Sequence, residues 1–240
     1  MRLRQDTILI TGGTSGIGLE LAEQLSARGN TVIVTGRNQE RLRRTRESHP
    51  YLQAYSVEVT DLASIESFHR HVVADFPTLD VLINNAGLMQ NIYFKSASAE
   101  GVADEVAVNL TGPILMTQVF LPHLIRQPES AIVNVTSGIA YFAFDKAPIY
   151  SASKLGLHSY TQTLRKQLAD TSVKVFELAP PRTTKPMFSG SEADNREVDR
   201  IPKMPISQVV SALITGMTRD RHEILPGMSK LLRVMGKIRL

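Results

Sequence analysis

Three polar side chains in the middle of the chain have types and spacing suited to proton transfer. Tyr150 and Lys154 are four residues apart in a helical stretch and so share one face of that helix, and Ser137 follows a buried strand. A tyrosine hydroxyl has a pKa near 10, and a nearby ammonium lowers that pKa by about one to three pH units. We predict that Tyr150 is a general acid or base, that Lys154 lowers its pKa, and that Ser137 donates a hydrogen bond to a carbonyl or alcohol oxygen.

Each of these residues is ordinary when taken alone. A serine after a strand is usually a cap, a tyrosine is often a half-buried core residue, and a lysine is usually a solvated charge. Their joint spacing, together with a glycine-rich turn upstream, favours the chemical interpretation.

That turn lies between a short apolar run, Ile8 to Ile10, and an amphipathic helical pattern that begins near Gly16, within residues 7–28. Glycines let the backbone approach a ligand closely, and the helix directs its free N–H groups at the turn, which suits a phosphate. The spacing is Gly-x-x-x-Gly-x-Gly and not the common Gly-x-Gly-x-x-Gly, and Leu19 excludes a Walker loop. The glycines alone favour a nucleotide site over a merely tight turn by about two to one.

Polar residues follow two later strands. Arg37 comes after residues 31–35, where an arginine accommodates the 2′-phosphate of NADP and an acid would bind the ribose of NAD. We expect this contact at about three to one over a solvated arginine.

Asn84 and Asn85 lie at the end of the strand expected within 80–87. For these two residues, a contact with a ligand and a role in a turn are equally favoured. Asn109 has a free carbonyl or marks a kink, since Pro113 lacks the N–H that would bond to it.

Strand and helix patterns alternate along the whole chain without antiparallel turn signals. This alternation predicts an α/β fold: one doubly wound parallel β-sheet of Rossmann type, with about seven strands and helices on both faces. We expect a single domain over residues 1–240, with a substrate lid at about 181–205. The helices are expected at 61–76, 99–125, 150–170 and 206–218, and the later strands at 53–56, 131–136, 173–178 and 222–225.

Composition limits the function classes. The chain has 240 residues, no cysteine and six scattered histidines, so no metal site is expected. The net charge of +4 comes from the tail, which argues against a nucleic-acid partner. The absence of cysteine, of a signal segment and of an uninterrupted apolar run predicts a cytoplasmic protein.

The tail at about 228–240 has the pattern of a basic amphipathic helix. Leu231, Leu232, Met235 and Ile238 share one face, with Lys230, Arg233 and Lys237 opposite. Such a helix binds an anionic membrane or a partner, but it packs on the body about two times in three.

These motifs together resemble the short-chain dehydrogenase/reductase family over almost the whole length. The matching residues are Thr11-Gly-Gly-Thr-Ser-Gly-Ile-Gly18, Asn84-Asn-Ala-Gly87, Asn109, Ser137 and Tyr150-x-x-x-Lys154. The stretch Glu177-Leu-Ala-Pro-Pro181 is similar to the bacterial DltE-type branch. The resemblance implies NAD(P)-dependent hydride transfer with Tyr150 as the acid or base, a relay water held at Asn109, and a homodimer or homotetramer formed through 99–125 and 150–170. The cofactor-binding residues that we expect are Gly12, Thr14, Ser15, Gly16, Ile17, Gly18, Arg37, Val59, Asn85, Ala86, Gly87, Tyr150, Lys154, Pro180 and Thr183.

The chain departs from the family pattern at Glu58-Val59, where Asp-Val is common, and at Pro180-Pro-Arg-Thr-Thr-Lys185. The expected function is an oxidoreductase that prefers NADPH over NADH and interconverts a carbonyl and an alcohol. An apolar or aromatic substrate is indicated by Tyr93, Phe94, Tyr141, Phe142, Phe144 and Phe188, although packing of these rings on the core is equally favoured. Lys95, Lys146, Arg182 and Lys185 would also allow an anionic group. The alternative function is an NADP-binding sensor that acts through a protein or membrane-surface partner without turnover.

Overall fold

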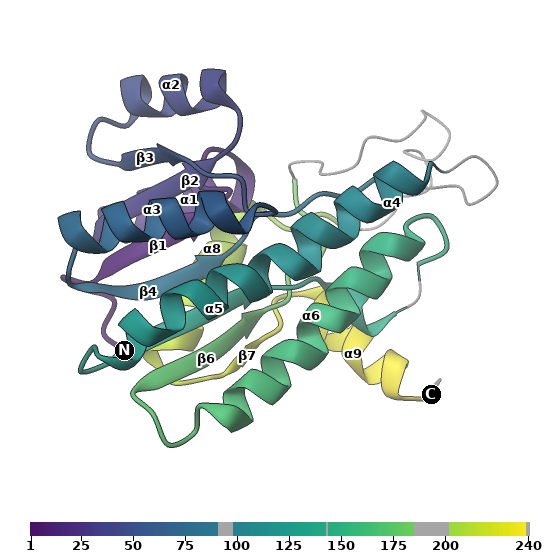
Figure 1. Ribbon diagram of the computed structural model, residues 1–240. Coiled ribbons are helices and arrows are strands. Elements are labelled where there is room, and N and C mark those ends of the chain that lie inside the picture. The colour runs from purple at the N-terminus through teal and green to yellow at the C-terminus, as the bar shows by residue number, and fades with distance from the viewer. Residues whose placement is uncertain (91–97, 143, 185–201, 239–240) are drawn as a thin grey trace.

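The computed structural model describes residues 1–90, 98–142, 144–184 and 202–238. The first strand, β1 (Thr7–Thr11), is buried along its whole length and lies near the centre of the sheet. All seven strands are parallel, in the order β3-β2-β1-β4-β5-β6-β7. This confirms the predicted sheet (Figure 1). The other strands are β2 (Thr31–Gly36), β3 (Gln53–Ser56), β4 (Leu79–Asn84), β5 (Ser130–Val135), β6 (Val173–Leu178) and β7 (Glu223–Ile224).

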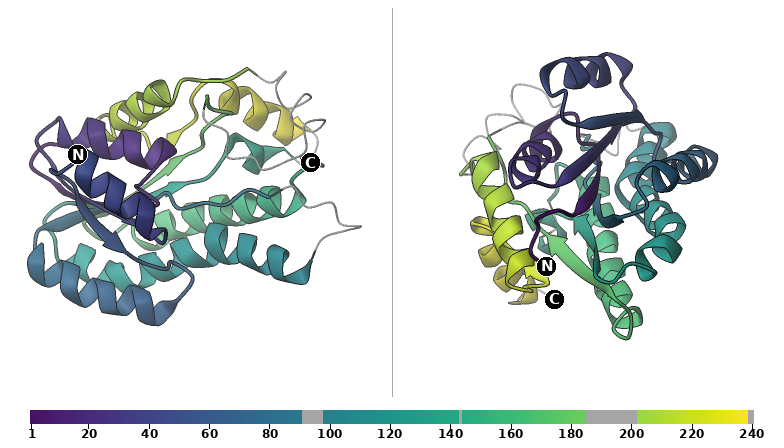
Figure 2. Two further views of the ribbon diagram at one scale, coloured as in Figure 1. Left: turned by 90° about the horizontal axis from the view of Figure 1, so that it is seen from above. Right: turned by 90° about the vertical axis from the view of Figure 1, so that its left-hand side faces the viewer.

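Helices cover both faces of the sheet, as Figures 1 and 2 show. On one face, α1 (Gly16–Ser26) packs against α8 (Ile206–Thr218). On the other face, α3 (Leu62–Asp75) packs against α5 (Gly112–Ile125), next to α6 (Pro148–Gln167). Each layer encloses its own apolar core, because alternate strand residues point to opposite faces. Within the described residues, the other α-helices are α2 (Gln39–Ser48), α4 (Ala99–Val106) and α9 (Met228–Ile238).

The long helical run at 99–125 is interrupted where the sequence places Pro113. A π-helical turn, η1 (Ala107–Thr111), joins α4 to α5, and the Gly112 N–H bonds to the carbonyl of Ala107. By length and composition alone, the run Ala99–Ile125 could cross a membrane. Half of its most apolar window is buried inside the fold, which is what the core helix of an α/β domain shows.

The lid expected at about 181–205 is described only at its two ends. Thr183 and Met204 form an isolated parallel bridge there, and Met204 donates its N–H to the carbonyl of Arg182. Residues 185–201 lie outside the described residues. The predictions for Lys185 and Phe188 fall there, and those for Tyr93, Phe94 and Lys95 fall in 91–97, which is also outside.

Candidate functional site

The carboxyl ends of the adjacent strands β1, β4 and β5 bring most of the predicted site residues to one edge of the sheet. Hydrogen bonds link these strand ends. The Thr11 hydroxyl accepts the N–H groups of Asn85 and Ala86, both at 3.0 Å, and the Asn85 amide donates to the Thr11 carbonyl at 2.9 Å. Asn85 therefore fixes the segment after β4 against the glycine-rich turn after β1.

The glycine-rich turn has a shape that only small residues allow. Gly12 and Gly16 have φ angles of 64° and 59°, in the left-handed region that favours glycine. At Gly18, a Cβ would lie 2.5 Å from both the Asn85 amide nitrogen and the Gly12 carbonyl oxygen. This packing holds the start of α1 close to the end of β4.

The start of α1 also suits an anionic group. Ser15 is the N-cap residue, yet its side chain does not cap the helix, and the first turn of α1 contains no acid. The N–H groups of this turn and the positive end of the helix dipole thus face the loop formed by Thr14 and Ser15. These residues fit a dinucleotide phosphate.

The two adjacent asparagines have different roles. Asn84 is buried, and its amide donates to the Asn134 side chain at 2.9 Å and to the Thr117 hydroxyl at 3.2 Å. Asn134 in turn donates to the Thr161 hydroxyl at 2.9 Å. Asn84 therefore joins β4 to β5, α5 and α6 inside the core, whereas Asn85 faces the turn.

Arg37 lies at the end of β2 with an exposed side chain. Its guanidinium is 3.6 Å from the carboxylate of Glu58, which follows β3, and 64% of the Arg37 side chain is exposed. Glu58 also accepts hydrogen bonds from the Thr60 N–H and hydroxyl. Arg37 is thus held near the strand ends, in a position open to solvent. The neighbouring Val59 is buried against Gly112.

Tyr150, Lys154 and Ser137 come together as their spacing predicts. Tyr150 is in the first turn of α6, and the Lys154 nitrogen lies 5.8 Å from the centre of its ring. Lys154 donates to the carbonyl of Val135, the last residue of β5, at 2.9 Å. Ser137 begins η2 (Gly138–Tyr141), and its hydroxyl is hydrogen-bonded to Tyr150.

The pKa values differ from the sequence-based expectation. Burial raises the pKa of Tyr150 to about 12, since the Ser137 hydrogen bond only partly opposes the loss of solvent around the phenolate. Burial also lowers the pKa of Lys154 to about 8. The expected lowering of the Tyr150 pKa by Lys154 does not appear: burial and the Glu105 charge raise this pKa, and the opposing contribution comes from Ser137.

Asn109 is fully buried in η1, and its side chain forms hydrogen bonds with one backbone segment. It accepts the Leu88 N–H at 2.8 Å and donates to the Leu88 carbonyl at 2.6 Å. Asn109 thereby anchors the chain that follows Gly87. Single π-turns of this kind often occur at functional sites.

Sequence reasoning missed Glu105, which lies four residues before Asn109. Its side chain is fully buried, and its charge affects the pKa values of both Tyr150 and Lys154. No signal in the sequence distinguishes it, because Glu100 and Asp104 on the same helix are acids too and both are exposed.

The loop after β5 is held by the end of β6. The Gly138 N–H bonds to the Pro180 carbonyl at 2.8 Å, so Ser137 is positioned partly by Pro180. Tyr141 packs its ring edge-on against His158, at 4.9 Å between centroids, and both side chains contact the buried Glu177. Tyr141 therefore belongs to a polar cluster in the core, which agrees with the packing alternative for this ring.

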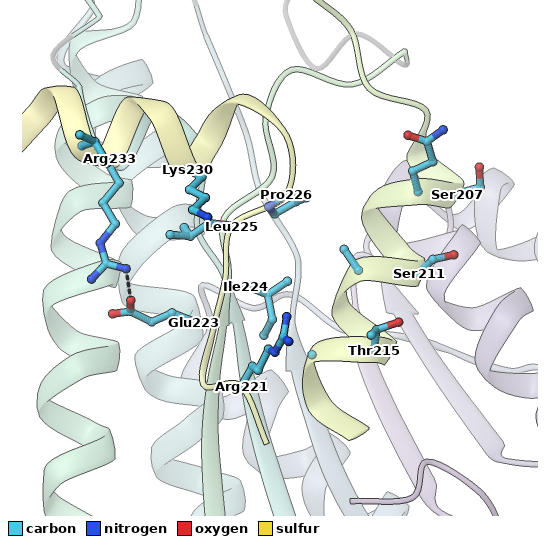
Figure 3. Close-up of a pocket in the computed structure, with 14 residues that line it drawn as sticks. Ser207, Ser211, Thr215, Arg221, Glu223, Ile224, Leu225, Pro226, Lys230 and Arg233 are labelled. Atoms are coloured by element: carbon cyan, nitrogen blue, oxygen red, sulfur yellow. Dashed lines mark hydrogen bonds and ion pairs between the residues drawn. The ribbon is translucent and has the colours of Figure 1, made fainter. Parts of the chain in front are cut away.

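The tail helix α9 packs on the body. Ser229 and Leu232 lie against Gly138, and Arg233 forms an ion pair with Glu223. That ion pair lines a pocket of about 870 Å³ between α8, β7 and α9 (Figure 3). Leu231, Val234 and Met235 remain exposed.

Comparisons with known proteins agree with this geometry. The model of the short chain dehydrogenase family matches residues 6–196. The uncharacterized oxidoreductase DltE of Bacillus subtilis (strain 168) is 38% identical over 228 residues, which cover 93% of this chain and 89% of that protein.

Two crystal structures share the fold. A short chain dehydrogenase of Burkholderia cenocepacia J2315 in complex with NADP has a TM-score of 0.83 and 25% identity, with 97% of this chain and 92% of that chain covered. A short chain dehydrogenase/reductase of Burkholderia phymatum in complex with NAD has a TM-score of 0.87 and 22% identity, with coverages of 100% and 94%.

Proposed function

The chain belongs to the short-chain dehydrogenase/reductase family and is an NAD(P)-dependent oxidoreductase of the DltE-like branch; we propose that it is an NADPH-preferring carbonyl reductase. In this proposal Tyr150 is the proton donor. The observation that carries the proposal is the convergence of Tyr150, Lys154 and Ser137 at the carboxyl end of β5. When bound, the nicotinamide supplies the hydride. The side chains of this edge hold the substrate oxygen and deliver its proton.

Each side chain has a distinct part in this reaction. Ser137 donates a hydrogen bond to the substrate carbonyl oxygen and holds it next to the Tyr150 hydroxyl. Tyr150 transfers its proton to that oxygen as negative charge develops there. Lys154, held in place by the Val135 carbonyl, stabilises the phenolate that remains. Asn109 keeps the segment after β4 in position through Leu88.

The protonation state of Tyr150 favours reduction. Its pKa of about 12 keeps the phenol protonated throughout the physiological pH range. A proton donor must carry its proton before the reaction, whereas alcohol oxidation would need the phenolate at the start.

NADPH preference rests on Arg37. It follows β2, where this fold binds the adenosine ribose, and its guanidinium lies next to that strand end. Its phosphate-binding partners would be Thr14 and Ser15 in the glycine-rich turn. Glu58 competes for Arg37, since the two side chains are 3.6 Å apart.

Changing Tyr150 to Phe tests the proposal. The variant keeps the ring but lacks the proton, so we expect kcat for NADPH-dependent reduction of a ketone, aldehyde and quinone panel to fall about 10²- to 10⁴-fold. NADPH binding, measured by fluorescence titration, should change by less than about twofold. Turnover by Y150F within threefold of the wild type would contradict the assignment.

The alternative of a cofactor-sensing protein has one supporting observation: α9 exposes Leu231, Val234 and Met235 on its outer side, with exposed fractions of 49%, 53% and 37%. Such a stripe suits a partner or a membrane surface. A sensor would keep its partner binding in Y150F, and the wild type would turn over no member of the substrate panel. Sedimentation with anionic vesicles, with and without residues 228–240, tests the membrane surface as the partner.

A further inference from the structure

A fully buried acid on β6, Glu177, lies at the centre of a hydrogen-bonded cluster next to the candidate site. Its oxygen Oε1 accepts a hydrogen bond from the Thr136 hydroxyl at 2.7 Å and one from the Tyr141 hydroxyl at 3.3 Å. The ring nitrogen Nδ1 of His158 lies 2.9 Å and 2.8 Å from the two carboxyl oxygens. A buried carboxyl group is costly unless it is hydrogen-bonded, and these contacts supply a partner for each of its oxygens.

Two of these partners lie at the two ends of the turn that carries Ser137. Thr136 comes directly before Ser137, and Tyr141 is the last residue of η2, for which Ser137 is the N-cap residue. Between these ends, the Gly138 N–H bonds to the Pro180 carbonyl at 2.8 Å. The segment from β6 onward therefore holds the turn at both ends and in the middle.

The third partner lies on the helix that carries Tyr150 and Lys154. His158 follows Lys154 by four residues, as Lys154 follows Tyr150, so the three side chains lie along one face of α6. Only 12% of the His158 side chain is exposed. Because a carboxylate can only accept hydrogen bonds, we assign the proton of this contact to Nδ1 of His158. One carboxyl group thus joins the Ser137 turn to the helix of the proposed proton donor.

The docking of β5 on α6 has its own hydrogen bond. Asn134 on β5 donates to the Thr161 hydroxyl on α6 at 2.9 Å, one turn of the helix beyond His158. This bond joins the strand to the helix within the core. What the Glu177 cluster adds is a hold on the turn that follows the strand, where Ser137 lies.

We propose that Glu177, together with His158, is a positioning residue that fixes the Ser137 hydroxyl next to Tyr150. The inference rests on the proposed function, in which Ser137 holds the substrate oxygen and Glu177 acts through Ser137. The Ser137 hydroxyl is already hydrogen-bonded to Tyr150 in this structure. A displacement of about 1 Å at such a group lowers a rate by about 10²-fold, so the hold on the turn has a kinetic consequence.

The test removes one donor of the cluster at a time, because Glu177→Leu would leave all of them without an acceptor and destabilise the fold. Thr136→Val removes the shortest hydrogen bond and keeps the shape of the side chain. Tyr141→Phe removes the longest one and keeps the ring that packs on His158. The matched control is Thr161→Val, which removes a buried hydroxyl whose described hydrogen bonds go to β5 and to α6 itself.

The first measurement is the steady-state reduction of the carbonyl panel by NADPH. In T136V we expect kcat to fall about 10- to 100-fold with KM within threefold, because the Ser137 hydrogen bond strengthens as charge develops on the substrate oxygen. Y141F should lose less, since its bond is longer. T161V should keep kcat within twofold at a similar loss of thermal stability. Wild-type kcat in both T136V and Y141F, or an equal loss in T161V, would overturn the proposal.

The second measurement separates positioning from a general loss of structure. Ser137→Ala alone should lower kcat about 10²- to 10³-fold, because it removes the donor to the substrate oxygen. Adding T136V to S137A should lower kcat by less than a further twofold, since the first change has removed the group that Thr136 helps to place. A T136V effect as large in S137A as in the wild type would overturn the proposal.

The third measurement needs no turnover. Amide hydrogen exchange followed by NMR should show the Gly138 N–H exchanging at least tenfold faster in T136V than in T161V, because only T136V loosens the Ser137 turn. Equal exchange at Gly138 in the two variants would overturn the proposal. A wild type that reduces no carbonyl would defeat the proposed function, and this comparison would still decide whether the Glu177 cluster holds the turn.

Discussion

Tyr150 and Lys154 are both almost completely buried, with 5% and 3% of their surfaces exposed. Burial disfavours the charged form of each, which is the phenolate of one and the ammonium of the other. The tyrosine therefore keeps its proton, whereas the lysine loses it more readily than usual. In the proposed reduction, the phenolate left by proton transfer needs the lysine charge beside it, so we expect Lys154 to set the upper pH limit of the reaction.

This leads to a prediction for the wild-type pH dependence. Carbonyl reduction should hold steady below the Lys154 pKa of about 8 and decline above it by about tenfold per pH unit, because the neutral amine no longer stabilises the phenolate. The check is kcat with NADPH between pH 6 and 10, in buffers of constant ionic strength. Reduction that accelerates up to pH 10 would contradict the assigned role of Lys154.

In the proposed function, the cofactor preference also depends on one side chain, Arg37. Arg37→Ala removes the cation expected at the 2′-phosphate, and a hydrogen bond to a charged group contributes about 1.5–3 kcal/mol. We expect kcat/KM with NADPH to fall about 10- to 100-fold, with little change for NADH. Arg41→Ala, an exposed arginine on α2, is the matched control. An unchanged NADPH to NADH ratio in R37A would assign the preference elsewhere.

Residues of the site could be predicted from the sequence where their spacing along one helix or strand determines their relative positions. Tyr150 and Lys154 share a helix face, and Ser137 follows a strand, so both placements could be predicted. The direction of the Tyr150 pKa could not, because it depends on how much solvent the assembled layers exclude. Glu105 could not either, since its neighbours Lys154 and Tyr150 are about fifty residues away in the chain.

At the scale of elements, the unit from β1 to α1 depends on close contact with the end of β4. Gly18→Ala would place a methyl group 2.5 Å from the Asn85 amide and from the Gly12 carbonyl. The turn must shift to admit it, and overpacking of this kind costs about 1–3 kcal/mol. We expect a lower free energy of unfolding by urea and at least tenfold weaker NADPH binding.

Gly156→Ala on α6 is the control for this substitution. There a Cβ would meet the end of the flexible Leu110 side chain at 3.2 Å, and alanine favours a helix interior by about 1 kcal/mol over glycine. The unfolding free energy of G156A should therefore change less than that of G18A. Wild-type stability and NADPH affinity in G18A would show that this contact is dispensable.

The junction of α4 and α5 shows how a local sequence signal becomes an element. Pro113 predicted a break in the helix at Asn109, and in the structure this break is the π-helical turn η1. The sequence could not specify the turn type, because that depends on which carbonyl the Gly112 N–H meets. The roles of the two adjacent asparagines could not be predicted from the sequence either. In the structure, the hydrogen bond of Asn84 to β5 in the core distinguishes Asn84 from Asn85.

For the whole molecule, the alternation of strands and helices predicted the parallel sheet, since parallel strands require crossover helices. The strand order and the packing of α9 on η2 depend on contacts between distant segments. Those contacts also place a half-buried pair of acids at the opposite edge of the sheet from the candidate site. Asp6 and Asp80 lie at the amino ends of β1 and β4, away from the candidate site, and can be studied without disturbing it.

The Asp6–Asp80 pair predicts how the stability of the protein depends on pH. Burial and the Asp6 charge raise the pKa of Asp80 from 3.8 to about 7, so the folded state binds a proton that the unfolded state has lost. Stability should therefore be greatest below about pH 4 for this group and decline as pH rises toward 7. Glu105, also with a raised pKa, acts in the same direction.

Asp80→Asn isolates the contribution of the pair. The amide oxygen can still accept the Thr7 N–H, which Asp80 binds at 3.0 Å, and its NH₂ group can donate to Asp6 without ionising. Above pH 7 the variant should be more stable than the wild type, by about 1–2 kcal/mol after allowance for the partial exposure of the site. Urea unfolding at pH 5 and pH 8 measures both proteins. The advantage of D80N should be larger at pH 8, because only there does the wild type carry two neighbouring carboxylates, and an equal difference at both pH values would rule out a shared proton between Asp6 and Asp80.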